Sequence, residues 1–206
     1  DIGVLIPARN EADAIAETLT GVAAQGRFAQ VVLVDDQSTD GTAGIARDAA
    51  QRLGLANFEV VNGKTPPSGA SGKLWALTQG FSRLKTNRVL LLDADILLAP
   101  GMVAALEARQ RQGNLGLVSL MAHLSMQRPW ERILIPAFIY FFKLLYPFAL
   151  ANKPGHWMAA AAGGCILTTR EALERIGGFE AIQGALIDDC TLARRIKRAG
   201  FATSWA

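Results

Sequence analysis

The sequence predicts one α/β domain with a mostly parallel central sheet that helices cover on both faces. Three observations carry this prediction. Short runs rich in Val, Leu and Ile alternate with helical patterns through the first half of the chain. These runs are apolar at successive positions, as in strands that are buried on both faces. The chain has 206 residues, half of them hydrophobic, which is enough for one large core.

The first half of the chain predicts four strands separated by three helices. The strands are expected at residues 2–8, 31–36, 58–62 and 88–95. The helices are expected at residues 10–26, 39–54 and 74–85. Asn10 can cap the first helix, with Glu11 and Asp13 in its first turn, and Gly54 is a typical stop for the second. This alternation indicates parallel strands joined by crossover helices.

The second half of the chain is less regular. A helix is expected from Pro100 to residue 112, because proline is favoured at the start of a helix, and residues 115–124 have the composition of a strand. Residues 163–179 predict a glycine turn, a short strand and a helix, and residues 186–201 predict a final helix. The chain begins one residue before a strand and stops abruptly, so we expect it to be a piece of a longer protein.

Composition and charge exclude several classes of protein. Only 19% of the residues are charged and the mean hydropathy is +0.22, which excludes a disordered chain. The net charge of +3 suits an anionic lipid surface or a phosphate-bearing ligand, or is a basic surface without a partner. Aromatic residues are not interleaved with basic ones, so nucleic acid is not an expected partner. Cys165 and Cys190 form no C-x-x-C pair and are expected to be reduced.

Two of the predicted strands end in acidic residues. Asp35 and Asp36 follow "VVLV", and Asp93 and Asp95 follow "VLLL". In open parallel sheets, ligands bind beyond the carboxyl ends of the strands. Alternation along a strand would place Asp93 and Asp95 on the same side, with Ala94 opposite. Two such carboxylates can hold a hard divalent cation, with phosphate oxygens completing the coordination shell of the ion. The alternative is a purely structural turn, because Asp is common in the turns that follow strands.

The loop at residues 63–73 needs comparison with the nucleotide-binding P-loop. Gly72 and Lys73 match the Gly-Lys pair of that motif. Pro67 stands where the first glycine is required, and Leu74 stands where Ser or Thr is required. The loop is therefore not a P-loop, and Lys73 either reaches a phosphate or is a solvated lysine.

Six segments occur in an order that is typical of one enzyme family. They are "VLIPARNE" (4–11), "VVLVDDQSTDGT" (31–42), "GKLWAL" (72–77), "LLLDAD" (90–95), "GGCILTTREALERIGGF" (163–179) and "DDCTLARRIKRAGF" (188–201). Together they resemble a family 2 glycosyltransferase with the GT-A fold, and they cover almost the whole chain. The "PP…SGKLWAL" form of the central loop is similar to the hopene-associated subgroup of that family.

The resemblance implies roles on the side of a nucleotide-sugar donor. Asp36 would contact the base or ribose of a uridine nucleotide, and Lys73 is a candidate for its phosphates. Asp93 and Asp95 match the D-x-D motif, in which Asp95 is the stronger candidate to bind Mg²⁺ or Mn²⁺. The first nucleotide-binding loop is matched by Pro7, Arg9, Asn10 and Glu11.

The resemblance also implies roles on the side of the acceptor. Asp189 matches the general base of the family, in a pair that is Glu-Asp in the family and Asp188–Asp189 here. The only histidines, His123 and His156, are weaker candidates for a site role. The remaining candidates near the acceptor are Asp188, Gly163, Gly164 and Trp157.

The activity that follows from the resemblance is an inverting sugar transfer. The expected donor is a UDP-sugar, and the expected acceptor is a lipid or isoprenoid, with a hopanoid as one candidate. Within a single domain at 1–206, residues 1–98 would bind the nucleotide and residues 99–206 the acceptor. Two alternatives stay open: a metal-dependent nucleotidyltransferase and a non-catalytic membrane scaffold. The missing glycine-rich N-terminal loop disfavours the former, and the intact acidic residues disfavour the latter.

Residues 133–151 form an apolar segment whose length is that of a transmembrane candidate. Lys143 lies at its centre, and Pro136 and Pro147 are expected to interrupt a helix, which argues against a simple span. Basic residues flank the segment and its aromatic content is high, so we expect it to lie in the membrane interface, with Lys143 reaching lipid phosphates. The alternative is a buried core helix. The expected location is the cytoplasmic face of a membrane, with transmembrane helices elsewhere in the full-length protein.

Overall fold

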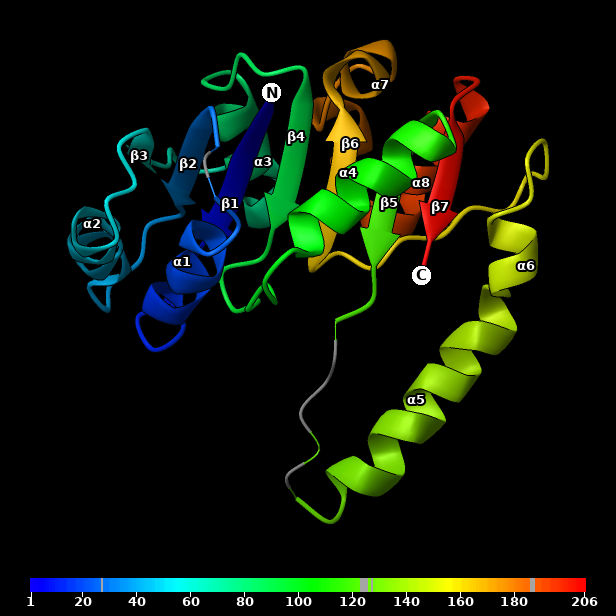
Figure 1. Ribbon diagram of the computed structural model, residues 1–206, viewed down its shortest axis with the longest axis horizontal. Helices are drawn as coiled ribbons and strands as arrows, with labels where there is room; N and C mark the ends of the chain where they lie inside the picture. Colours follow the sequence, from blue (N-terminus) through cyan, green and yellow to red (C-terminus); the bar gives the residue numbers. More distant parts are fainter. Residues whose placement is uncertain (27, 123–125, 127, 186–187) are drawn as a thin grey trace.

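The computed structural model describes the chain except for residues 27, 123–125, 127 and 186–187. The described residues form seven strands: β1 (Ile2–Ala8), β2 (Gln30–Asp35), β3 (Phe58–Asn62), β4 (Arg88–Leu92), β5 (Leu115–Leu120), β6 (Cys165–Thr169) and β7 (Ala202–Trp205). They make one sheet in the order β3-β2-β1-β4-β6-β5-β7 (Figure 1). Strand β6 pairs antiparallel with both β4 and β5, whereas the other pairings are parallel. The predicted mostly parallel α/β sheet is therefore confirmed.

Helices cover both faces of this sheet. The helices of the described chain are α1 (Ile15–Ala23), α2 (Thr42–Arg52), α3 (Gly72–Phe81), α4 (Met102–Gln112), α5 (Glu131–Leu145), α6 (Phe148–Ala151), α7 (Arg170–Arg175) and α8 (Asp188–Arg198), with a 3₁₀ turn η1 (Glu180–Ile182), and all but α5 pack beside the sheet. In the view of Figure 1, α1 and α4 lie in front of the sheet, and α3 and α8 lie behind it. The predicted order βαβαβαβ of the first half is confirmed.

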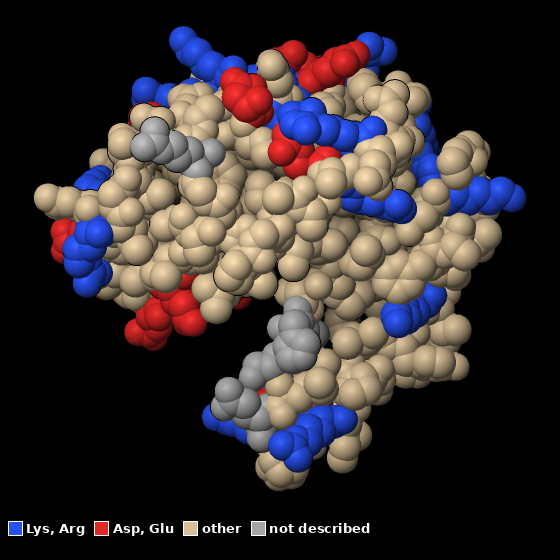
Figure 2. Space-filling view, in the orientation of Figure 1, with Lys and Arg blue, Asp and Glu red and all other residues tan. Residues whose placement is uncertain are grey.

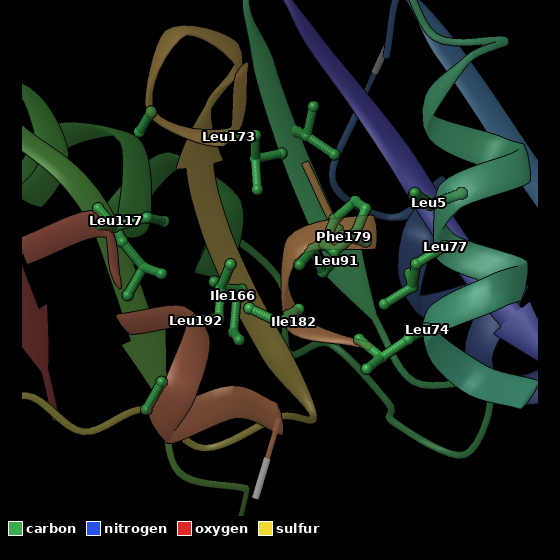
Figure 3. Close-up of a cluster of buried hydrophobic side chains, with 14 of the residues drawn as sticks. Leu5, Leu74, Leu77, Leu91, Leu117, Ile166, Leu173, Phe179, Ile182 and Leu192 are labelled. Carbon is green, nitrogen blue, oxygen red and sulfur yellow. The ribbon is translucent and has the colours of Figure 1, made fainter. Parts of the chain in front are cut away.

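The two faces of the sheet support separate hydrophobic clusters. Behind the sheet, Leu5 of β1 and Leu91 of β4 pack with Leu74 of α3 and with Phe179 (Figure 3). In front, Leu90 belongs to the other cluster, which includes residues of α1, α2 and α4. Leu90 and Leu91 are neighbours, yet both are almost fully buried, because successive side chains of a strand point to opposite faces. Full burial of such a side chain stabilises the fold by about 1.5–3 kcal/mol.

Several predicted boundaries were wrong. Strand β4 ends at Leu92 instead of residue 95, and α1 begins at Ile15 instead of Asn10. Asn10 is no cap: it has φ of 56° and lies in the loop before the helix. Strand β7 was not predicted: it has only four residues, too few for a periodic pattern, and it pairs with β5.

Helix α5 extends away from the sheet as an arm (Figure 1). None of its 15 residues is buried, so the alternative of a buried core helix is wrong. Pro136 lies inside the helix without ending it, contrary to prediction, whereas α5 ends just before Pro147. The hydrogen bond that Pro136 removes belongs to the exposed Arg132, whose carbonyl can bond to water instead. In the described part of the chain, no helix is both long enough and apolar enough to cross a membrane.

The arm joins the body through aromatic side chains. Phe148 of α6 stacks on Trp205 of β7 with ring centroids 4.0 Å apart, and Phe142 of α5 meets the same indole edge-on at 5.5 Å. Asn152 then bonds the backbone of Trp205 twice: its Nδ2 donates to the carbonyl at 2.8 Å, and its Oδ1 accepts from the N–H at 2.7 Å. The root of the arm is therefore tied to the edge strand, while most of α5 faces solvent.

Candidate active site

A cleft of about 410 Å³ opens beyond the carboxyl ends of β1 and β4. Its walls come from the loops that follow β1, β2 and β4 and from the first turn of α3. The lining residues are Pro7, Ala8, Arg9, Glu11, Asp36, Gly72, Lys73, Ala76, Asp93, Ala94 and Asp95. The structure thus brings together every donor-side residue singled out in the sequence except Asn10.

Asp36 lies at the bottom of one wall, just after β2. Its side chain is almost fully buried, and Arg9 Nη1 lies 3.4 Å from its Oδ2. Among the described residues, nothing bonds its buried Oδ1. Gly72 leaves the space for this carboxylate, since a Cβ there would lie 2.6 Å from Asp36 Oδ2. A buried acceptor without a donor costs about 1–3 kcal/mol, so a ligand that donates to Oδ1 would be favoured.

Asp93 and Asp95 lie in the turn that follows β4. Asp93 N–H donates to the carbonyl of Gly164 at 3.1 Å, and Thr18 Oγ1 of α1 donates to the carbonyl of Ala94 at 2.7 Å. Both carboxylates line the cleft while Ala94 is buried. The argument from alternation along a strand was wrong, because the strand has ended: the turn and its two anchors orient these side chains instead.

Lys73 forms an ion pair with Asp93 across the cleft, with Nζ 2.7 Å from Oδ1. Burial by itself would lower the pKa of Lys73. The negative charge of Asp93 outweighs burial, with smaller contributions from Asp189 and Asp188, so the pKa of the lysine is raised. Burial also raises the pKa of Asp93; Lys73 opposes this, and the charges of Asp95 and Asp188 add to it. One lysine thus faces several carboxylates, and the surplus negative charge favours a cation.

The donor set fits a hard cation such as Mg²⁺ or Mn²⁺. Asp93 and Asp95 offer carboxylate oxygens, which these ions prefer. Glu11 lines the same cleft, and its pKa is raised first by burial and then by the negative charges of Asp95 and Asp93. Across the part of the chain that the structure describes, no three Asp, Glu, His or Cys side chains converge on one point. A cation here would need further oxygens from a ligand, as metal–diphosphate sites usually do.

Asp189 lies at the start of α8, on the other side of Lys73. A small cavity of about 10 Å³, room for roughly one water, is lined by Lys73, Asp93, Asp188 and Asp189 among other residues. Burial, followed by the charge of Asp188, raises the pKa of Asp189 to about 6, against the opposing charge of Lys73. Gly163 packs directly on this carboxylate and leaves no room for a Cβ. With a pKa of about 6, Asp189 is ionised at neutral pH and more basic than an ordinary carboxylate, which suits a general base.

Asn10, His156 and Trp157 lie apart from this constellation. Asn10 braces two loops, since its Oδ1 accepts from Thr39 N–H at 2.9 Å. Trp157 is 68% exposed and lines a different cleft together with His156. His123 falls outside the described residues.

Sequence reasoning missed the residues that hold the first loop in place. Asp40 Oδ2 accepts from Ala12 N–H at 3.0 Å, and Thr42 Oγ1 accepts from Glu11 N–H at 2.9 Å. A hydrogen bond from Thr42 also lowers the pKa of Asp40, which keeps this carboxylate ionised. The "DGT" segment at the start of α2 is an available signal, because Asp and Thr are typical of helix starts and turns.

Curated relatives of this chain include two enzymes whose names contain an isoprenoid compound. The undecaprenyl-phosphate 4-deoxy-4-formamido-L-arabinose transferase of Edwardsiella ictaluri is 34% identical over 116 residues, covering 54% of this chain and 34% of the relative. The 4,4'-diaponeurosporenoate glycosyltransferase of Staphylococcus aureus (strain MRSA252) is 29% identical over 198 residues, covering 92% of this chain and 49% of the relative. The chain thus spans half or less of the length of these relatives.

Solved glycosyltransferases share the fold. A mannosyltransferase from Pyrobaculum calidifontis, in complex with GDP-Man and Mn²⁺, superposes with a TM-score of 0.74 at 26% identity, over 100% of this chain and 54% of that one. A glucosyl-3-phosphoglycerate synthase from Mycobacterium tuberculosis, in complex with Mn²⁺ and UDP-glucose, superposes with a TM-score of 0.63 at 20% identity. The superposition covers 99% of this chain and 68% of that one. Residues 3–177 match Glycosyl transferase family 2. The fold is therefore GT-A, and the chain belongs to glycosyl transferase family 2.

Proposed function

We propose that this chain is the catalytic domain of an inverting glycosyltransferase that moves a sugar from a nucleotide-sugar to a lipid acceptor. One observation carries the proposal: Lys73 lies between Asp93 of the D-x-D motif and Asp189, at the carboxyl edge of the sheet. Residues 1–98 supply the donor side and residues 99–206 the acceptor side. Family membership supports glycosyl transfer over the nucleotidyltransferase alternative.

The proposed donor is a UDP-sugar. Asp36 offers its unpartnered Oδ1 to a base N–H or a ribose hydroxyl, and Arg9 holds the other oxygen. Pro7 and Glu11 complete the same wall of the cleft. Similar structures hold either GDP-Man or UDP-glucose, so the base needs a direct test.

Calorimetry with UDP and with GDP, each with Mn²⁺ and then with EDTA, tests the donor site. We expect UDP to bind with Mn²⁺, and binding to be lost with EDTA and in Asp95→Ala. Tighter binding of GDP would assign a GDP-sugar instead. Absence of binding by both nucleotides would contradict the proposed donor cleft.

Asp93 and Asp95 would hold Mg²⁺ or Mn²⁺, with Asp95 the main ligand. The ion supplies charge stabilisation for the leaving diphosphate. Lys73 offsets the charge of Asp93 and lines the same cleft, so its remaining N–H groups can donate to a diphosphate that binds there. Gly164 holds Asp93 through its backbone carbonyl and so positions the motif.

Asp189 is the proposed general base. The acceptor oxygen attacks the anomeric carbon, the bond from that carbon to the diphosphate breaks, and Asp189 takes the proton of an acceptor hydroxyl. Asp188 raises the proton affinity of Asp189, and Gly163 leaves its carboxylate room. Asp189→Asn is expected to reduce turnover by on the order of 10²–10⁴-fold with a hydroxyl acceptor. Unchanged turnover would mean either another base or an acceptor that is already ionised.

The proposed acceptor is a lipid or isoprenoid, with a hopanoid as one candidate, presented at a membrane surface on the cytoplasmic side. Helix α5 supports this: it exposes large apolar side chains along its length, including Phe138, Phe141 and Leu145 at 61–68% exposure. Figure 2 shows basic side chains at the lower end of the arm and few charges along it. A helix of this kind lies in the headgroup region of a bilayer, where Lys143 can reach phosphates.

Liposome flotation tests the role of α5. The double variant Phe138→Glu, Phe141→Glu should no longer float with liposomes, because two carboxylates would enter the apolar region. The matched control is Ala104→Glu, Ala105→Glu, which adds the same charge to exposed positions of α4. Equal flotation of both double variants would contradict an interfacial α5.

A further inference from the structure

A second cleft, of about 330 Å³, lies at the far end of α8 from Asp189. Arg198 follows Asp189 by nine positions in α8, which corresponds to about 14 Å along the helix. The cleft shares no lining residue with the donor cleft. It is lined by Pro154, Gly155, His156, Trp157, Lys197, Arg198, Gly200, Phe201 and Ala202.

Two cations and no acid line this cleft. Lys197 Nζ donates to the carbonyls of Ala151 at 2.7 Å and Met158 at 2.8 Å. An ammonium has three N–H donors, so one remains for another acceptor. Within the described ranges, neither Lys197 nor Arg198 forms an ion pair. Burial without a carboxylate partner lowers the pKa of Lys197, and an anion nearby would relieve this cost.

Aromatic rings form the remaining walls. His156 and Trp157 stack with centroids 5.7 Å apart, and Trp157 is 68% exposed. Phe201 also lines the cleft. Gly155 and Gly200 have φ of 72° and 96°, left-handed values that shape the two loops bordering the cleft.

We propose that this cleft binds a phosphate-bearing ligand, with the phosphoryl group between Lys197 and Arg198 and the organic part against Trp157. Cations in the last turn of a helix commonly stabilise its dipole, and this accounts for Arg195. It does not account for Lys197, whose ammonium bonds carbonyls outside α8. The site is independent of the donor cleft, and it lies beside the root of the arm, where either a lipid headgroup or a free phosphate ester can reach it.

Two probes distinguish the two sources of phosphate. Glycerol 3-phosphate is titrated against the full chain while tryptophan fluorescence is recorded, with Trp157→Phe identifying the responding indole. Phosphatidylcholine vesicles with and without phosphatidylglycerol are used in parallel flotation. A response to glycerol 3-phosphate means a soluble phosphate ester is accepted, and a response to phosphatidylglycerol alone means a lipid headgroup; both support the site.

Arg198→Ala is the decisive variant, and Arg195→Ala is its matched control, one turn away on α8 and outside the cleft. We expect Arg198→Ala to weaken binding of the responding probe about fivefold or more and Arg195→Ala to change it less than twofold. Equal weakening by both variants would indicate a non-specific electrostatic attraction to the positive charge of α8 and would overturn the proposal. A failure of both probes to bind would also overturn it. Calorimetry of UDP with Mn²⁺ on Arg198→Ala checks separately that the donor cleft is unaffected.

Discussion

At the scale of single residues, the buried carboxylate of Asp189 lowers the free energy of unfolding when it is ionised, and the same burial makes it a stronger base. Its pKa is raised from 3.8 to about 6, mainly by burial, so folding favours the protonated form. The loss of folding stability that ionised Asp189 causes is absent below about pH 3.8, grows between about pH 3.8 and 6, and stays constant at higher pH. Asp189→Asn should therefore raise the free energy of unfolding at pH well above 6 by up to about 3 kcal/mol. Urea unfolding measured in EDTA checks this; a gain that persists at pH below 3.8 would contradict the electrostatic cause.

The same pKa predicts the pH dependence of the reaction with a hydroxyl acceptor. Because the base must be ionised, kcat/KM for the acceptor should rise about tenfold per pH unit below about 6 and level off above. Steady-state rates across that range are the measurement. Asp189→Asn should lose this limb along with its activity, and a limb of unchanged midpoint in the variant would assign the titration to another group.

Gly72 tests how tightly the donor wall is packed. A Cβ there would lie 2.6 Å from Asp36 Oδ2, so Gly72→Ala must displace that carboxylate. We expect nucleotide binding to weaken by about 10- to 150-fold, since the loss of one charge-assisted hydrogen bond costs about 1.5–3 kcal/mol. Calorimetry with UDP measures this. Gly44→Ala is the control, because its Cβ would meet nothing within 4 Å in α2, and there the change should leave binding unaltered.

At the scale of elements, the root of the arm is held by Asn152. Its side chain makes two hydrogen bonds with the backbone of Trp205, next to the stacked Phe148. Asn152→Ala should lower the free energy of unfolding by about 1–3 kcal/mol. It should also speed hydrogen exchange in α5 and α6 more than in α1. Equal acceleration in all three helices would mean that the arm is not a separate unit, and exposed Gln112→Ala of α4 serves as the control.

At the scale of the whole molecule, the proposed donor and acceptor sides meet where β6 joins the parallel strands. Strand β6 lies antiparallel against β4 and places Gly163 and Gly164 beside the turn that carries Asp93. A ligand that bridges this junction should stabilise the fold as one unit. At a concentration 100 times its Kd, UDP with Mn²⁺ should add about 2.7 kcal/mol. Thermal unfolding of the native chain and of Asp95→Ala measures this, and equal shifts in both would contradict Asp95 as a ligand of the ion.

Much of the fold could be predicted because its signals are local. The strands β1 to β4 follow apolar runs, and the stop of the second helix at Gly54, which has φ of 68°, follows backbone chemistry. What escaped were features that depend on partners distant in the sequence. The end of β4 at Leu92 is set by the turn that the Ile96 N–H closes on the carbonyl of Asp93 at 3.2 Å, and by the anchor from Thr18 to Ala94.

The sequence by itself determined the sheet with its helices, the acids after the strands and the apolar segment, because periodicity and composition report which positions are buried. Only the tertiary structure decided what each surface meets. It placed Asp189 beside Lys73 and Trp157 in another cleft, and it turned α5 outward. The physical reason is that a pattern along the chain records burial, whereas distances between side chains depend on how the packed elements are arranged.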